Sequence, residues 1–144
     1  LHKYTGVLTP TRGGVDYTAS VFVPLTAMLT STSWDGDAHS TEAATLIDMS
    51  VVFSVPAGVK AVLCRLIARD SVAANLSNLS TYYVGLGPSA TEYNQLTVRV
   101  VGGDYWTEQT GIVSCDTNGD IYYRIVASGA STMDVYIQVY GYWL

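Results

Sequence analysis

The stretch that decides the fold is Asp120–Leu144, which reads DIYYRIVASGASTMDVYIQVYGYWL. Two runs in it alternate apolar and polar residues with a period of two, and the small residues 128–132 separate them. This alternation is typical of β-strands with one buried face, so the sequence predicts a β-hairpin here. The residues predicted to point into the core are Ile121, Tyr123, Ile125, Ala127, Met133, Val135, Ile137 and Val139.

The opposite face of this predicted hairpin carries tyrosines in place of the Lys and Glu of an ordinary solvent-facing surface. Tyrosine is enriched in the contact surfaces between proteins. We therefore predict that a partner covers this face and that the chain end belongs to the same interface. The predicted interface residues are Tyr122, Arg124, Tyr136, Gln138, Tyr140, Tyr142 and Trp143. The alternative within one chain is that Leu1–Thr11 or Thr30–Thr45 folds back over the patch.

Further short strands are predicted along the rest of the chain, bounded by Gly, Pro, Asn and Asp. They cover residues 15–23, 46–55, 59–69, 81–86, 95–101, 105–108 and 112–115. In the second of these, the alternation predicts that Ile47, Met49, Val51 and Phe53 face the core. The strand 59–69 has apolar residues on both faces, which predicts that both faces are covered.

Between these strands, the polar segment Thr30–Thr45 is predicted to be a loop and Asp116–Gly119 a hairpin turn. Such a series of short strands without helical periodicity predicts an all-β fold. We expect a single-domain antiparallel β-sandwich over residues 1–144, with a jelly roll as the favoured topology and room for an extended N-terminal arm over residues 1–14.

The composition limits the classes of partner that the chain is expected to bind. Only 13% of its 144 residues are charged, the formal net charge is −5 and the pI is near 4.6. A nucleic-acid partner is not expected, because no basic patch is present to neutralise phosphates. A membrane partner is not expected either, since no apolar run approaches the ~20 residues of a span. A surface with so few charges is expected to be covered in an assembly or to face the outside of a cell or particle.

Two groups of polar residues have side chains that could bind a metal ion. Asp35, Asp37 and His39 alternate in the Thr30–Thr45 segment, and Asp116, Asn118 and Asp120 resemble the first half of a calcium loop. Ordinary polar turns explain both groups, and the calcium pattern lacks its distal glutamate. We therefore predict no metal and no cofactor.

Catalysis is not expected. The chain has two histidines, and no nucleophile elbow, zinc-binding helix motif or phosphate-cradling glycine loop occurs in it. The sequence therefore predicts no catalytic residues. It leaves open whether the two cysteines, Cys64 and Cys115, form a disulfide.

Several segments of the sequence resemble segments of one group of known proteins. They are Ser33–Asp37 (SWDGD), residues 51–71 (VVFSVPAGVKAVLCRLIARDS), residues 81–89 (TYYVGLGPS) and residues 119–144. Together they are similar to the small β-sandwich structural proteins of tailed bacteriophages, over roughly residues 33–144. The resemblance implies a jelly-roll protein of the virion, either a capsid decoration or cement protein or a module of a head or tail fibre.

Two functions from different classes follow. The first is a non-enzymatic virion protein, assembled in the host cytoplasm, which forms a homo-oligomer (a trimer is favoured) and contacts the major capsid protein or other virion proteins. The alternative is a carbohydrate-binding module in which aromatic side chains stack on a glycan. A glycan binder should act as a monomer, whereas a decoration protein should be oligomeric or bound to particles.

Overall fold

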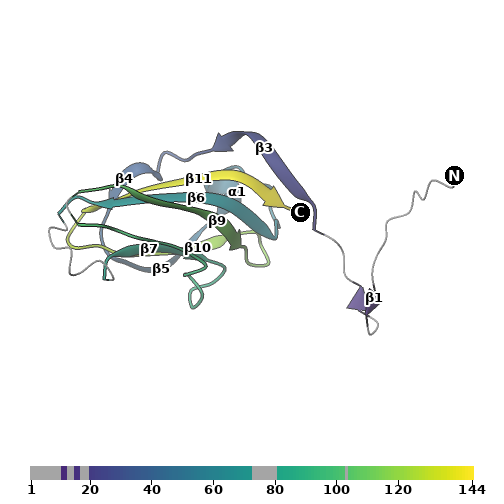
Figure 1. Cartoon of the computed structure of the whole chain (residues 1–144). Coiled ribbons are helices and arrows are strands. Elements are labelled where there is room, and N and C mark those ends of the chain that lie inside the picture. Colours follow the sequence, from purple (N-terminus) through teal and green to yellow (C-terminus); the bar gives the residue numbers. More distant parts are fainter. Residues whose placement is uncertain (1–10, 13–14, 17–19, 73–80, 103) are drawn as a thin grey trace.

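Two antiparallel β-sheets pack face to face and form the sandwich (Figure 1). The computed structural model describes residues 11–12, 15–16, 20–72, 81–102 and 104–144. Strands account for 56% of these residues and helix for 3%, so the predicted all-β sandwich is confirmed. A separate two-residue ladder joins β1 (Thr11–Arg12) to β2 (Val15–Asp16). Most of the arm expected over residues 1–14 lies outside the described residues.

The larger sheet has five strands and the smaller one has four, drawn as upper and lower layers in Figure 1. The larger sheet has the order β3-β11-β6-β9, with β4 also paired to β11. Its strands are β3 (Phe22–Leu29), β4 (Asp35–His39), β6 (Ala61–Asp70), β9 (Thr107–Ser114) and β11 (Met133–Trp143). The smaller sheet has the order β5-β10-β7-β8. Its strands are β5 (Glu42–Ile47), β7 (Tyr83–Gly87), β8 (Leu96–Arg99) and β10 (Ile121–Val126).

The connectivity is that of a jelly roll, as the sequence favoured. Strand β4 pairs with β11, β5 with β10, β6 with β9 and β7 with β8, so the first of these strands pairs with the last and so on inward. The chain thus resembles one long hairpin rolled up, with alternate pairs placed in different sheets. The further pairs β6–β11 and β7–β10 complete the two sheets.

The predicted hairpin over residues 120–144 is wrong, although both of its strands exist. Strands β10 and β11 belong to opposite sheets, and residues 127–132 cross between them. The eight residues expected to point inward are all buried, with at most 9% of any one exposed. Period-two alternation reports which face of a strand is buried, but it carries no information about the strand's hydrogen-bonding partner.

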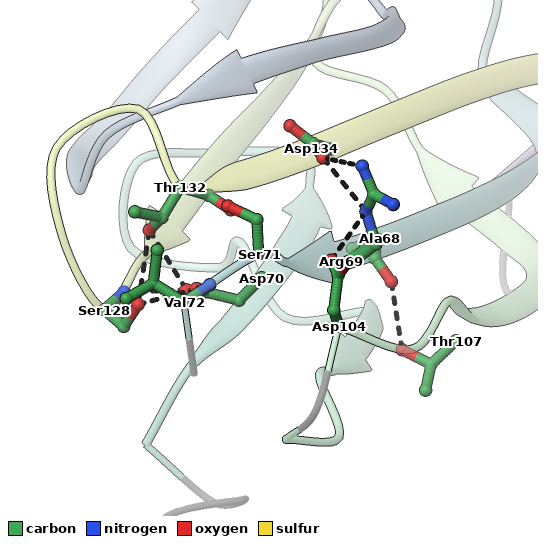
Figure 2. A network of polar contacts seen from close by, with 10 residues as sticks. All are labelled: Ala68, Arg69, Asp70, Ser71, Val72, Asp104, Thr107, Ser128, Thr132 and Asp134. Atoms are coloured by element: carbon green, nitrogen blue, oxygen red, sulfur yellow. Dashed lines mark hydrogen bonds and ion pairs between the residues drawn. The ribbon is translucent and has the colours of Figure 1, made fainter. Parts of the chain in front are cut away.

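The crossing between the sheets is fixed by Asp70, a fully buried carboxylate at the end of β6 (Figure 2). Asp70 accepts hydrogen bonds from the backbone N–H and the hydroxyl of Ser128, at 2.8 and 2.6 Å, and from the hydroxyl of Thr132 at 3.2 Å. The N–H of Ser71 donates to the carbonyl of Thr132 at 2.9 Å. The end of β6 therefore holds both ends of the segment that leads from β10 to β11.

The predicted strand 46–55 is also wrong beyond Ile47. Strand β5 ends there, and a single helical turn, α1 (Met49–Val52), follows. Asp48 caps this turn, since its carboxylate accepts the N–H of Ser50 at 3.1 Å and that of Val51 at 3.0 Å. Hydrogen bonds, above all the one from the Ser50 hydroxyl, also hold the pKa of Asp48 below its usual value.

The change from strand to helix alters which side chains reach the core. Met49 and Phe53 are four residues apart and both buried, as on one face of a helix. Val51 is 76% exposed, so its predicted core position is wrong, whereas Ile47, Met49 and Phe53 are confirmed as core residues.

The remaining differences concern strand boundaries. The expected loop Thr30–Thr45 contains β4 and most of β5. Its polar composition reflects exposed strands: β5 is an edge strand of its sheet, and among the described strands β4 pairs with β11 alone. The predicted strands 105–108 and 112–115 form a single strand, β9. Residues 116–119 do form a turn, but the strands that flank it, β9 and β10, lie in different sheets.

Candidate interaction surface

The outer face of the five-stranded sheet carries a row of apolar residues near the C-terminal end of β11. Gly141 on β11 lies opposite Pro24 on β3 and Leu63 on β6, and Leu63 lies opposite Ile112 on β9. Trp143 starts a second row, opposite Phe22 on β3 and Ala61 on β6. We call these residues the C-terminal patch: Phe22, Pro24, Ala61, Leu63, Ile112 and Trp143.

Two aromatic rings form the centre of the C-terminal patch. The ring centroids of Phe22 and Trp143 are 4.5 Å apart. Gly141 makes this packing possible, because a Cβ at that position would lie 2.5 Å from a carbon of the Phe22 ring. The patch remains accessible: Phe22 is 39% exposed and Ile112 56% exposed. It also continues to the chain end, where Leu144 pairs with Val21 through two backbone hydrogen bonds.

The other end of the same face is charged. Arg65 forms an ion pair with Glu108 across β6 and β9. Arg69 bridges Asp134 on β11, at 2.6 Å, and Asp104, at 3.2 Å (Figure 2). The hydrogen bond to Glu108 is the main cause that raises the pKa of Arg65, and the hydrogen bond to Asp134 is the main cause that raises the pKa of Arg69. One face therefore combines an apolar end with an end of paired charges.

The predicted interface residues do not lie on one face. Because β10 and β11 are in opposite sheets, Tyr122 and Arg124 lie on the outer face of the four-stranded sheet. Of the predicted interface residues on β11, Tyr136, Gln138, Tyr140 and Trp143 point outward on the five-stranded sheet. The register shifts between Val139 and Gly141, so Tyr142 points inward and packs against the core. The expected single face is therefore wrong, while a role for these residues in an interface remains a prediction.

The tyrosines of β11 are partly covered by their own chain. The ring of Tyr136 lies over Gly36, where a Cβ would come within 2.8 Å of it, and its centroid is 5.3 Å from that of Trp106. The hydroxyl of Tyr140 is 3.1 Å from the side-chain oxygen of Gln138. Gly36 belongs to the Thr30–Thr45 segment, so that segment does contact one of the tyrosines expected in the interface.

A loop of the same chain covers part of the outer face of the four-stranded sheet. Residues 88–95 fold back over β7, and a Cβ at Gly85 or Gly87 would lie 2.4 or 1.6 Å from a backbone oxygen of Tyr93 or Glu92. Arg124 donates a hydrogen bond of 3.0 Å to the hydroxyl of Tyr93 and lies 5.0 Å from the centroid of its ring. Arg124 is thus part of an internal contact.

Asp116 and Asp120, which resemble part of a calcium loop, are engaged in hydrogen bonds of the fold. Asp116 accepts the N–H groups of Asn118 and Asp120, at 2.9 and 3.0 Å, which forms the turn before β10. Asp120 accepts the N–H of Met49 at 2.9 Å. Within the described residues, no group of three or more His, Cys, Asp or Glu side chains is placed to hold a metal ion.

The other candidate metal site, Asp35, Asp37 and His39, lies along β4. His39 stacks on Trp34, with ring centroids 4.6 Å apart, and its Nδ1 is 3.7 Å from a carboxylate oxygen of Glu42.

The two cysteines are free thiols, with Cys64 buried and Cys115 half-buried. Burial raises the pKa of Cys115 to about 12.

No family model and no curated protein matches this chain. Among the described residues, no helix is long and apolar enough to cross a membrane.

The sequence indicated only part of the C-terminal patch. Trp143 was expected in an interface, and the apolar residues on both faces of residues 59–69 indicated a second covered face, which includes Leu63. Phe22, Pro24 and Ile112 were missed. They become neighbours of Trp143 only through the pairing of β3, β11, β6 and β9, which are far apart in sequence.

Proposed function

We propose that this chain is a non-enzymatic structural protein of a tailed-phage virion. In this role it decorates or cements the capsid, or forms part of a head or tail fibre, through protein–protein contacts. The observation that carries the proposal is the C-terminal patch. Monomeric proteins rarely expose a contiguous apolar surface of this kind, and aromatic residues at its centre are typical of interfaces. The jelly-roll fold, which recurs in viral capsids, supports the same function.

The composition of the patch predicts the character of the contact. Its members are aromatic or aliphatic, and the nearby charges of Arg65 and Glu108 are already paired. Burial of such a surface against another copy or a neighbouring virion protein should depend weakly on salt, because apolar contact is not screened. Assembly should therefore persist when the ionic strength is raised.

Two substitutions in the patch test the proposal. Ile112→Glu and Trp143→Glu place a charge in the contact, which should abolish the oligomer and the binding to particles. The matched control is Val51→Glu, since Val51 is an exposed apolar residue on α1 that is not a member of the patch. Mass would be measured by light scattering after gel filtration. Binding would be followed by density-gradient fractionation of virions with peptide mass spectrometry.

The outcomes separate clearly, provided that circular dichroism shows the variants to be folded. Loss of assembly in both patch variants, with Val51→Glu unchanged, is the expected result. A wild-type chain that is monomeric and absent from the particle fraction would overturn the proposal. Patch variants that assemble and bind particles like the wild type would show that the C-terminal patch is not the interface.

A further inference from the structure

A groove of about 710 Å³ runs along one open edge of the sandwich, where β8 of one sheet faces β9 of the other. One wall comes from the outer side of β7 and β8 and from the loop of residues 88–95, and the other wall comes from the start of β9. The residues that carry the argument are Tyr83, Tyr93, Asn94, Thr97, Arg99 and Gln109. The volume is in the range of sites that bind small ligands, roughly 300–1,000 Å³.

The walls of the groove are fixed by contacts within the fold. The hydroxyl of Thr107 lies 3.1 Å from the carbonyl oxygen of Arg99 and 3.3 Å from that of Ala68, so it joins the two sheets (Figure 2 shows the contact with Ala68). Tyr93 is held by the hydrogen bond from Arg124 and by the packing of its loop on Gly85. A groove formed in advance in this way loses little entropy when a ligand binds.

The side chains in the groove combine two kinds of chemistry. Tyr83 and Tyr93 supply half-buried aromatic rings, and the guanidinium carbon of Arg99 lies 5.4 Å from the centroid of the Tyr83 ring. Asn94 and Gln109 supply exposed amides, and neither side chain makes a hydrogen bond with the part of the chain that the structure describes. Rings that offer an apolar face, beside planar groups that both donate and accept, suit a ligand with apolar C–H faces and many hydroxyls.

We propose that this groove binds a neutral saccharide. The hydroxyl-rich ligand follows from the amides and threonines beside the two rings. Neutrality follows from the charged side chains of the lining, one cation (Arg99) and one anion (Glu108), whose formal charges cancel. This function goes beyond virion assembly and does not involve the C-terminal patch, which lies on the outer face of the other sheet.

The test is a titration of the full ¹⁵N-labelled chain, followed by two-dimensional NMR. The probes are four neutral oligosaccharides (maltohexaose, cellohexaose, mannohexaose and galactohexaose), with an oligogalacturonate as the charged comparison, each at up to about 10 mM, a concentration that detects weak binding. At least one neutral probe should shift the side-chain amide signals of Asn94 and Gln109 and the backbone signals of Tyr83 and Tyr93. Its affinity should be the same in low and high salt.

Substitutions then locate the binding. Tyr93→Ala and Asn94→Ala should each weaken binding by about tenfold, because each removes one of the predicted contacts. Tyr93→Phe keeps the ring and should retain binding, and Tyr105→Ala removes an exposed tyrosine outside the groove and serves as the control. If no neutral probe shifts these signals, if only the charged probe does, or if Tyr93→Ala and Asn94→Ala both bind like the wild type, the proposal is wrong.

Discussion

The two outer faces of the sandwich differ in what covers them. On the four-stranded sheet, residues 88–95 pack over β7, and Tyr93 engages Arg124 of the neighbouring strand β10. On the five-stranded sheet, Phe22 and Ile112 of the C-terminal patch remain exposed within the described part of the chain. One face is thus partly closed by its own loop, while the other keeps an apolar surface open to a partner.

Glycine marks this difference in the sequence. Gly85 and Gly87 occupy outward positions on β7, and their missing side chains let the backbone of the loop approach closely. The corresponding outward positions on β6 and β9 carry Leu63 and Ile112. A strand that is covered by the backbone of another segment of the same chain needs small residues. An interface for another protein needs side chains that fill space.

The largest expected effect concerns the crossing that places β10 and β11 on different faces. Asp70→Ala removes a fully buried carboxylate that accepts hydrogen bonds from the half-buried Ser128 and the buried Thr132. We expect the free energy of unfolding to fall by about 3 kcal/mol. Urea denaturation would measure the change.

Asp104→Ala is the matched control, because it removes an acidic side chain that is 52% exposed and paired with Arg69 at the surface. Its effect should be much smaller. Equal losses in the two variants would mean that Asp70 does not hold the crossing.

The sequence predicted which faces of the strands are buried better than it predicted which strands pair with each other. The inward residues of β6 and β10, and those of β11 as far as Val139, follow from alternation alone, since each buried position there lies two residues from the next. The hairpin failed because strands that are adjacent in a sequence can join different sheets, and in this jelly roll β10 and β11 do so. The pairing of β11 with β6 bridges more than 60 residues, as in Met133 with Asp70, and no local pattern encodes it.

The error at residues 46–55 has a different cause. Ile47, Met49, Val51 and Phe53 fit a strand by period, but Met49 and Phe53 also fit one turn of helix. Asp48 decides between them, because its carboxylate caps the N–H groups of Ser50 and Val51. Asp48, with Ser50 two residues later, is the local signal for a helix start, and the apolar alternation conceals it.

The next prediction tests the covered face. Gly87→Ala would place a methyl group 1.6 Å from the backbone oxygen of Glu92, so the loop must move away from β7. We expect a destabilisation of about 1–3 kcal/mol, as for other overpacked sites. Thermal unfolding would measure it, and NMR would show changed signals for Tyr93.

Gly129→Ala is the control for this substitution. A Cβ at Gly129 would meet only a methyl carbon of Thr132, at 3.2 Å, in an exposed part of the crossing segment. It should change stability little. If Gly87→Ala is as well tolerated as Gly129→Ala, the loop does not pack on this face.

The smallest expected effect tests whether the other face is open. Ile112 and Val113 are neighbours on β9, and Ile112 is 56% exposed while Val113 is fully buried. Ile112→Thr keeps the branched side chain and should change the free energy of unfolding of the dissociated chain by no more than about 0.5 kcal/mol. Val113→Thr buries a hydroxyl and should cost about 1–3 kcal/mol. Both would be measured by denaturation at a concentration where light scattering shows monomers.

A near-zero effect of Ile112→Thr would mean that its apolar side chain is not needed for folding, which favours its use in an interface. A loss as large as that of Val113→Thr would show instead that Ile112 packs within its own fold, and that the five-stranded face is as closed as the other.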